Sequence, residues 1–133
     1  MIKINPNYLQ TVFQTKACPP GWPNCFAVVT ACNPNGVFQA EFENQKLDEA
    51  FRAELEKKNI SYYRVTGGSP DFCHAEPGFA VAVDLDTSLA LARQWQQEAI
   101  FWIEDKFVFV IPNDGSHRIK IGTWHSRLVK SNT

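Results

Sequence analysis

The stretch FAVVTACNPNG, residues 26–36, constrains the fold more strongly than any other part of the chain. Its first seven residues form a nearly continuous apolar run rich in β-branched side chains, which is typical of a buried strand. Asn33, Pro34 and Gly36 then end the run, because Asn and Gly tolerate turn conformations and Pro fixes its own φ. The sequence therefore predicts a buried strand over 26–32 that stops at a turn.

Helices and further strands are predicted on both sides of this strand. The clearest helix covers 44–59, where apolar residues recur on one helical face and Asn44 is a plausible N-cap. A second helix is predicted over 87–97, with Asp86 as its N-cap. The other predicted strands are 8–13, 60–66, 78–84, a hairpin over 99–112 and an edge strand over 117–124.

This order of elements predicts an α+β fold with a mostly antiparallel sheet and two helices packed on one face. A ferredoxin-like βαββαβ core would fit residues 26–104. A chain of 133 residues with 44% hydrophobic residues can bury its own core, so a single domain over 1–133 is expected. No apolar run is long enough to span a bilayer, and residues 1–16 lack the apolar segment of a signal peptide. We therefore expect a cytoplasmic protein with no membrane partner.

Charge is unevenly distributed along the chain, although the net charge is only −1. Residues 41–105 contain 13 acidic and 6 basic residues, whereas the two flanks together contain 1 acidic and 7 basic residues. If the flanks meet in space, they form a basic surface that attracts anions. The alternative is that the flanks simply complement the acidic middle.

Four cysteines, Cys18, Cys25, Cys32 and Cys73, are expected to be reduced in a cytoplasmic chain. The six residues between Cys18 and Cys25 do not match zinc-ligand spacing. Simple packing is therefore the favoured interpretation, while a disulfide or a metal site that includes His74 stays open. No cofactor or metal is predicted, because the phosphate-loop, dinucleotide, nucleophile-elbow and zinc-protease motifs are all missing.

Several short motifs, taken in order, resemble the DUF3293 family of small bacterial proteins of unknown function. The matching stretches are YLQTVF, FAVVTACNPNG, ENQKLDEAFRAEL, GGSPDFCHAEPGFAV, ARQWQQEAIFWIE and WHSR. The resemblance marks Asn33–Pro34, Glu43–Asn44, Glu76, Gln97 with Ala99, and Trp124 with Arg127. The proline-bearing loop with Cys18 and Cys25 departs from the family pattern. The resemblance implies no activity.

The predicted binding site consists of Asn33, Glu43, Asn44, His74, Glu76, Gln97, Trp124 and Arg127. Asn33 lies at a strand end, where polar side chains often line a cleft, or it is only a turn residue. Gln97 faces a ligand or, as we favour, satisfies carbonyl groups where the second helix ends.

The other candidates also have two interpretations each. His74 and Glu76 could form an acid–base or metal-binding pair, or they belong to an ordinary surface loop. Trp124 and Arg127 could hold a base and a phosphate, or they close the core and pair with Glu43 or Glu76.

Two functions follow from these residues. The favoured one is a non-catalytic binding or interaction module with a basic surface that suits an anion, a nucleotide or nucleic acid, with a protein partner also possible. The alternative is a small enzyme with a polar cleft built from Asn33, Glu76, Gln97 and Arg127.

Overall fold

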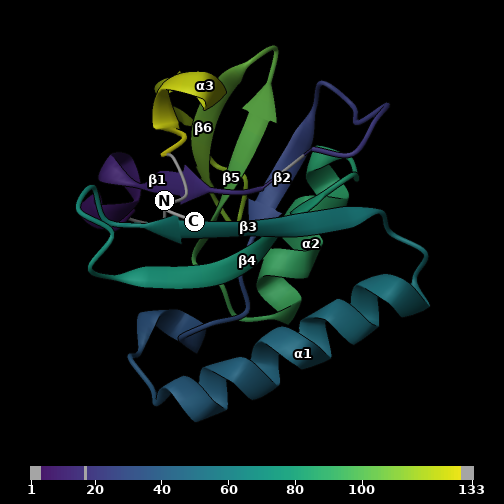
Figure 1. Cartoon of the computed structure of the whole chain (residues 1–133), viewed down its shortest axis with the longest axis vertical. Helices are drawn as coiled ribbons and strands as arrows, with labels where there is room; N and C mark the ends of the chain where they lie inside the picture. The colour runs from purple at the N-terminus through teal and green to yellow at the C-terminus, as the bar shows by residue number, and fades with distance from the viewer. Residues whose placement is uncertain (1–3, 17, 130–133) are drawn as a thin grey trace.

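A seven-stranded antiparallel sheet in the order β1–β3–β4–β2–β5–β6–β7 forms the frame of the molecule (Figure 1). The computed structural model describes residues 4–16 and 18–129. The strands are β1 (Val12–Gln14), β2 (Phe26–Val29), β3 (Tyr62–Gly68), β4 (Ala75–Val81), β5 (Ala99–Glu104), β6 (Phe107–Pro112) and β7 (Ile119–Thr123). The helices are α1 (Glu41–Lys57), α2 (Leu85–Gln94) and the short α3 (Trp124–Arg127), with 3₁₀ turns η1 (Pro6–Gln10) and η2 (Pro34–Gly36).

β2 is the central strand, and all four of its residues are buried. It pairs with β4 on one side and β5 on the other, so both of its edges are hydrogen-bonded. Ala27 and Val29 belong to one apolar cluster, while Phe26 and Val28 belong to a second cluster on the opposite face. Burial on both faces explains the continuous apolar run that identified this strand in the sequence.

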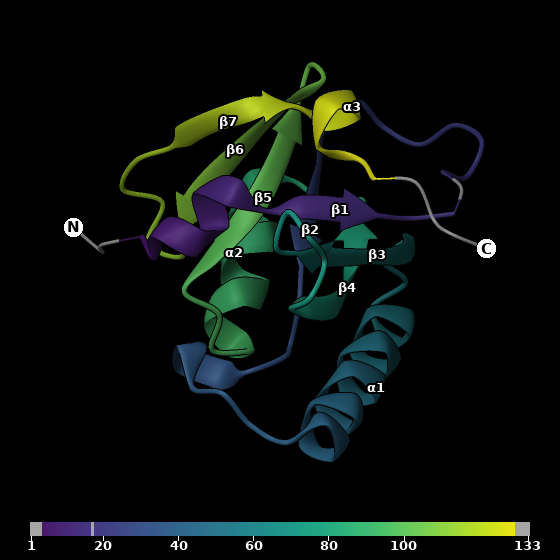
Figure 2. The ribbon, with the colours of Figure 1, turned by 60° about the vertical axis from the view of Figure 1, so that its left-hand side comes forward.

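The two long helices cover the Ala27 and Val29 face (Figures 1 and 2). Phe51 of α1 stacks on Trp95 at the end of α2, with ring centres 5.2 Å apart and an interplanar angle of 6°. This arrangement confirms the predicted α+β fold with two helices packed on one face. The elements from β2 to β5 follow the order βαββαβ, but the sheet has three further strands and curls, so a ferredoxin-like core stays a prediction.

The opposite face of the curled sheet is closed by the two flanks of the chain. Phe13 of β1 forms a parallel bridge with Leu128, and the Val129 amide donates to the Phe13 carbonyl at 2.8 Å. Trp124 packs its ring 5.1 Å from that of Phe13 and 5.5 Å from that of Phe26. The N-terminal and C-terminal flanks therefore meet in space, as the basic-surface interpretation requires.

Several predicted boundaries are wrong. β2 ends at Val29 instead of residue 32, and β4 covers Ala75–Val81 instead of 78–84. Three other differences have identifiable causes. α1 begins at Glu41 instead of residue 44, because Asn44 bonds to residues outside the helix instead of capping it. Asp84, not Asp86, caps α2 and accepts from the Thr87 amide at 2.7 Å. The predicted strand over 8–13 starts only at residue 12, because Asn5 and Pro6 initiate a 3₁₀ turn before it.

Among the described residues, no helix combines the length and the hydrophobicity needed to cross a bilayer.

One ion pair ties α1 to the sheet. Nη1 and Nη2 of Arg64 on β3 donate to the Asp48 carboxylate on α1, each at 2.7 Å, and the Arg64 Cζ also lies 4.2 Å from the Phe79 ring centre. Asp48 is buried, and a bidentate pair of this geometry is among the stronger polar contacts in proteins.

Asp48→Ala should lower the free energy of unfolding by about 1–2 kcal/mol, because it removes two charge-assisted hydrogen bonds between α1 and β3 while the half-exposed Arg64 stays in contact with water. Urea denaturation measures the loss. The matched control is Glu49→Ala, which removes the neighbouring exposed carboxylate and should change stability by less than about 0.5 kcal/mol. Equal losses in the two variants would show that the pair does not hold α1 on the sheet.

Candidate functional site

Asn33, Gln39, Asn44 and Glu76 form one hydrogen-bonded group, which we call the Asn33 cluster. It lies at the end of the sheet where β2 has just ended and β4 and β5 begin. All four residues are partly buried, so the cluster is also within reach of solvent.

Asn33 is the centre of the cluster. Its backbone has φ 50° and ψ 61°, a left-handed conformation that Asn tolerates better than most residues. Its side-chain Nδ2 donates to a Glu76 carboxylate oxygen at 2.6 Å. Its Oδ1 accepts from Asn44 Nδ2 at 2.9 Å and from the Gln39 amide at 3.0 Å. One side chain therefore joins the turn after β2 to both α1 and β4.

Asn44 completes the connection to α1. Its Oδ1 accepts from the Asn33 amide and from Gln39 Nε2, both at 2.8 Å. Gln39 precedes the N-cap Ala40, and Asn44 is the fourth residue of the helix. These are the two positions that a hydrophobic staple joins, so here a hydrogen bond sets the entry angle of the helix.

Glu76 is the ionisable member of the cluster. Burial raises the pKa of its carboxyl, while the hydrogen bond from Asn33 opposes that change. Burial, together with the charges of Glu76 and Glu98, raises the pKa of the Tyr8 phenol as well, so that hydroxyl stays protonated. The Tyr8 ring rests on Phe101, with centres 5.6 Å apart. The cluster thus has a carboxyl group and a phenol beside it.

Gln97 is buried next to the cluster. Its Nε2 donates to the carbonyl of Cys32 at 3.0 Å and to that of Trp95 at 3.2 Å, so it caps the end of α2 and ties it to the segment that follows β2. Burial raises the pKa of the Cys32 thiol to about 11, which keeps that thiol neutral. Both residues act as packing and capping groups.

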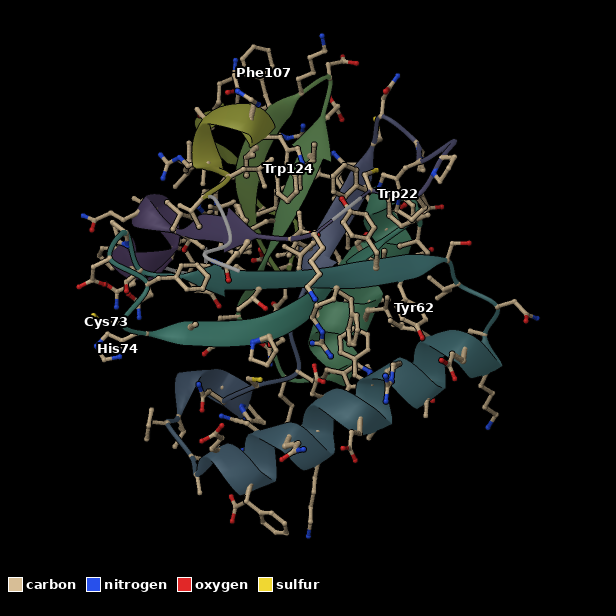
Figure 3. The ribbon with its side chains drawn as sticks, in the orientation of Figure 1. Trp22, Tyr62, Cys73, His74, Phe107 and Trp124 are labelled. Carbon is tan, nitrogen blue, oxygen red and sulfur yellow. The ribbon has the colours of Figure 1, made fainter. Side chains whose placement is uncertain are left out.

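The structure brings four of the eight predicted site residues together and places the other four elsewhere. Asn33, Asn44, Glu76 and Gln97 converge. Glu43 is exposed on α1, and His74 is exposed beside Cys73 at the tip of the β3–β4 hairpin (Figure 3).

Trp124 and Arg127 have structural partners. The Trp124 ring closes the curled face of the sheet, as described above. The Arg127 guanidinium donates to the carbonyls of Leu9, Thr11 and Ile121, and so holds the N-terminal turn against β7. Its partners are backbone carbonyls, not the carboxylates of Glu43 or Glu76 that the sequence suggested.

The cysteines are free, and three of the four are exposed. Within the part of the chain that the structure describes, no three His, Cys, Asp or Glu side chains gather as a metal site would require.

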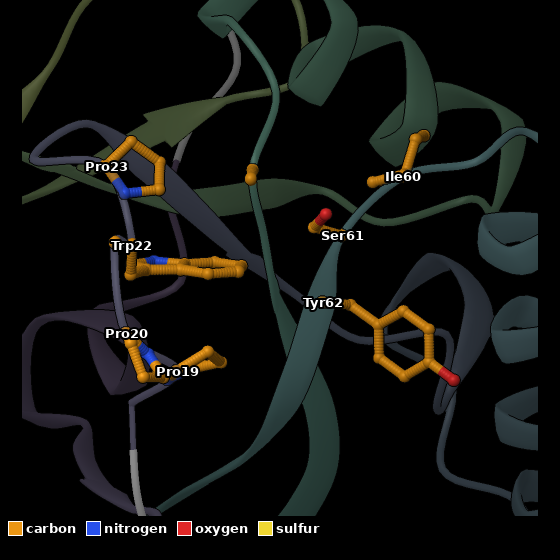
Figure 4. Close-up of a pocket in the computed structure, with 9 residues that line it drawn as sticks. Pro19, Pro20, Trp22, Pro23, Ile60, Ser61 and Tyr62 are labelled. Atoms are coloured by element: carbon orange, nitrogen blue, oxygen red, sulfur yellow. The ribbon is translucent and has the colours of Figure 1, made fainter.

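An open pocket of about 480 Å³ lies between the proline-rich loop and the start of β3 (Figure 4). Pro19 and Trp22 line one side, and Ile60 and Tyr62 line the other. The Trp22 ring packs edge-on against Tyr63, with centres 4.8 Å apart. The lining holds no charged side chain, so the pocket suits an apolar group and offers no acid–base chemistry.

Aromatic side chains of β6 lie beside basic side chains of β7 and of the residue just before it, and we call this surface the basic aromatic face. It consists of Phe107, Phe109, Arg118 and Lys120. Lys120 Nζ lies 4.0 Å from the Phe107 ring centre and 5.9 Å from that of Phe109. Arg118 Cζ lies 5.1 Å from the Phe109 ring centre. The Phe109–Lys120 register pair places these groups on the same side of the sheet.

The sequence did not identify Gln39, Tyr8, Phe107 or Phe109 as site residues. Gln39 becomes recognisable only when the first residue of α1 is known. The two phenylalanines were hidden in the apolar run FVFVIP, where alternation could not separate a buried side from an exposed one.

These features define a class of α+β protein, one with a curled antiparallel sheet and a polar cluster at one sheet end. The chain belongs to the family described as protein of unknown function DUF3293, whose model matches residues 29–100. The matched segment contains the whole Asn33 cluster and Gln97, but not β6, β7 or α3. No curated protein and no solved structure matches the chain.

Asn44→Ala should lower the free energy of unfolding by about 2–3 kcal/mol, because it leaves the partly buried Asn33 amide and Gln39 side chain without their hydrogen-bond acceptor. Chemical denaturation provides the measurement. Gln45→Ala removes an adjacent, exposed amide and should be nearly neutral. A neutral Asn44→Ala variant would mean that the cluster does not organise the entry into α1.

Glu76→Gln keeps an acceptor for Asn33 but removes the titrating group. The folded state holds the Glu76 proton more tightly than the unfolded chain does, because the pKa is raised on folding. The ordinary pKa of a Glu carboxyl is 4.5. As the pH rises above that value, the free energy of unfolding of the wild type should therefore fall relative to that of Glu76→Gln. Unfolding free energies of both proteins across the acid range test this. The prediction is contradicted if the difference between the two unfolding free energies does not change with pH, or if it shifts in favour of the wild type as the pH rises.

Proposed function

We propose that this chain is a single-domain, cytoplasmic, non-catalytic binding module whose basic aromatic face takes a polyanion, with single-stranded nucleic acid as the best fit. The observation that supports this most directly is the contact of the Phe107 and Phe109 rings on β6 with two cations. These are Lys120 on β7 and Arg118 just before β7. The exposed Phe107 ring can stack on a base, the half-buried Phe109 ring lies on the same side of the sheet, and neighbouring cations can neutralise phosphates.

The charge balance of this face favours an anionic ligand. Lys106 lies in the β5–β6 turn and adds a third exposed cation beside Phe107. Two carboxylates lie near these cations: Asp105 is exposed in the same turn as Lys106, and Glu104 reaches Arg118 at 3.7 Å. Both partners of that pair are well exposed, so the pair is weak and a phosphate can replace it.

The geometry leaves fewer residues that could carry out chemistry in the enzyme alternative. Most polar atoms of the Asn33 cluster already bond to one another, and Arg127 bonds to carbonyl groups at a distance from it. Glu76 is then the one group of the cluster that could act as an acid or base, with Tyr8 beside it. An internal hydrogen-bonding role explains the cluster better, so binding is the function we prefer.

Titration of a fluorescent oligonucleotide with the protein tests the proposal at two salt concentrations. Single-stranded DNA or RNA should bind, and affinity should fall steeply as salt rises, because bound cations release counterions from the strand. Lys120→Gln should reduce the slope of log affinity against log salt by roughly one charge contact. Phe107→Ala should weaken binding by about 1–3 kcal/mol through lost stacking.

Lys57→Gln is the matched control, because it removes an exposed cation at the distant end of α1. It should leave affinity and salt dependence unchanged. Binding that is absent, that ignores salt, or that falls equally in Lys57→Gln would count against a nucleic-acid role for this face.

A further inference from the structure

The segment after β2 and the first turn of α1 expose three large apolar side chains within six residues. Val37 is 66% exposed, Phe38 86% and Phe42 64%. We call these three residues the apolar loop, and Figure 2 shows their segment, coloured blue, at the lower edge of the molecule. Single exposed apolar residues are ordinary, but several together commonly mark an interaction surface.

The apolar loop is held in a defined shape. The Gly36 amide donates to the Asn33 carbonyl at 2.9 Å, and the Val37 amide donates to the Pro34 carbonyl at 3.2 Å. The Asn35 amide reaches the Gln96 carbonyl at 2.7 Å, which fastens the turn to the end of α2. Exposure of the two Phe rings is therefore built into the fold, and a fixed loop loses little entropy when it binds.

The Asn33 cluster supports the same loop from its other end. Gln39 follows Phe38 directly, and both its backbone amide and its side chain are bonded into the cluster. Phe38 thus projects from a segment that is anchored immediately before and after it. The internal hydrogen bonds of the cluster therefore help to hold Phe38 exposed to solvent.

Acidic groups surround the apolar loop. Glu41 and Glu43 flank Phe42 and are exposed in the first turn of α1. Glu98 lies directly against the turn, since a Cβ on Gly36 would be only 2.2 Å from its Oε1. Lys46 is the nearby cation, with its Nζ 4.4 Å from the Phe42 ring centre. Three carboxylates against one ammonium favour a cationic partner and disfavour an anionic lipid surface or nucleic acid.

We infer that the apolar loop docks a basic segment of a partner protein, which inserts an apolar side chain beside Phe38 and Phe42 and pairs its Lys or Arg residues with Glu41 and Glu43. The inference concerns a different face from the basic aromatic face and stands independently of the proposed function. It requires no movement of the loop.

The test uses the full chain and a synthetic amphipathic Leu–Lys peptide, with a Leu–Glu peptide of the same apolar pattern as the charge control. Calorimetry at low salt should show binding of the Leu–Lys peptide alone. The double variant Phe38→Ser, Phe42→Ser should weaken that binding at least about tenfold, because exposed aromatic anchors dominate such contacts. Glu41→Lys with Glu43→Lys should weaken it as well.

Phe107→Ser is the matched control, since Phe107 is the other large exposed aromatic ring among the described residues and lies on the opposite side of the fold. It should bind the Leu–Lys peptide as wild type does. All these positions are exposed, so unchanged circular dichroism and urea midpoints confirm that each variant is folded.

Four results would overturn the inference. They are no binding of the Leu–Lys peptide, equal binding of both peptides, equal loss in Phe107→Ser, and retention of full affinity in the Phe38→Ser, Phe42→Ser variant. Sedimentation that reveals a dimer lost in that variant would make a second copy the occupant instead. Binding of the loop to phosphatidylcholine vesicles would replace the protein partner with a lipid surface.

Discussion

β2 must be buried on both faces, and the rest of the fold follows from that requirement. The helices α1 and α2 cover Ala27 and Val29, while Phe26 and Val28 need a cover of equal extent on the other side. The sheet supplies it by curling until β1, α3 and the segment around Leu128 close over those two side chains. The curl brings chain segments more than a hundred residues apart into contact, and Arg127 secures them through three backbone carbonyls.

The Asn33 cluster provides hydrogen-bond partners at the point where the chain leaves the buried strand β2. A strand end surrounded by other elements has amide groups that need partners, and those partners must be polar without carrying free charge into the core. Asn33 and Asn44 provide them, and burial raises the pKa of the Glu76 carboxyl, which accepts a hydrogen bond from Asn33. The family match covers this cluster, so the joint between β2, α1 and β4 lies within the part of the chain that defines the family.

The uneven charge along the sequence becomes a separation in space. The apolar loop, with the acidic groups around it, and the basic aromatic face lie at opposite ends of the molecule (Figures 1 and 2). The first surface falls within the residues matched by the family model, and the second lies beyond them. The proposed partner surface therefore lies within the matched segment, and the proposed polyanion surface lies outside it.

The sequence by itself determined the elements whose signal is local. The apolar run of β2, the amphipathic face of α1 and the helix-end role of Gln97 were all readable, and they were sufficient for the α+β class. The sequence grouped eight residues as one predicted site, and Asn33, Asn44, Glu76 and Gln97 are the four of them that lie together in the structure. Only the tertiary structure decided that Arg127 and Trp124 are structural, because their partners, Thr11 and Phe13 among them, lie more than a hundred positions away. Exposure of Phe38 and Phe107 was likewise undetermined, since an aromatic residue in an apolar run is exposed or buried according to which element covers it.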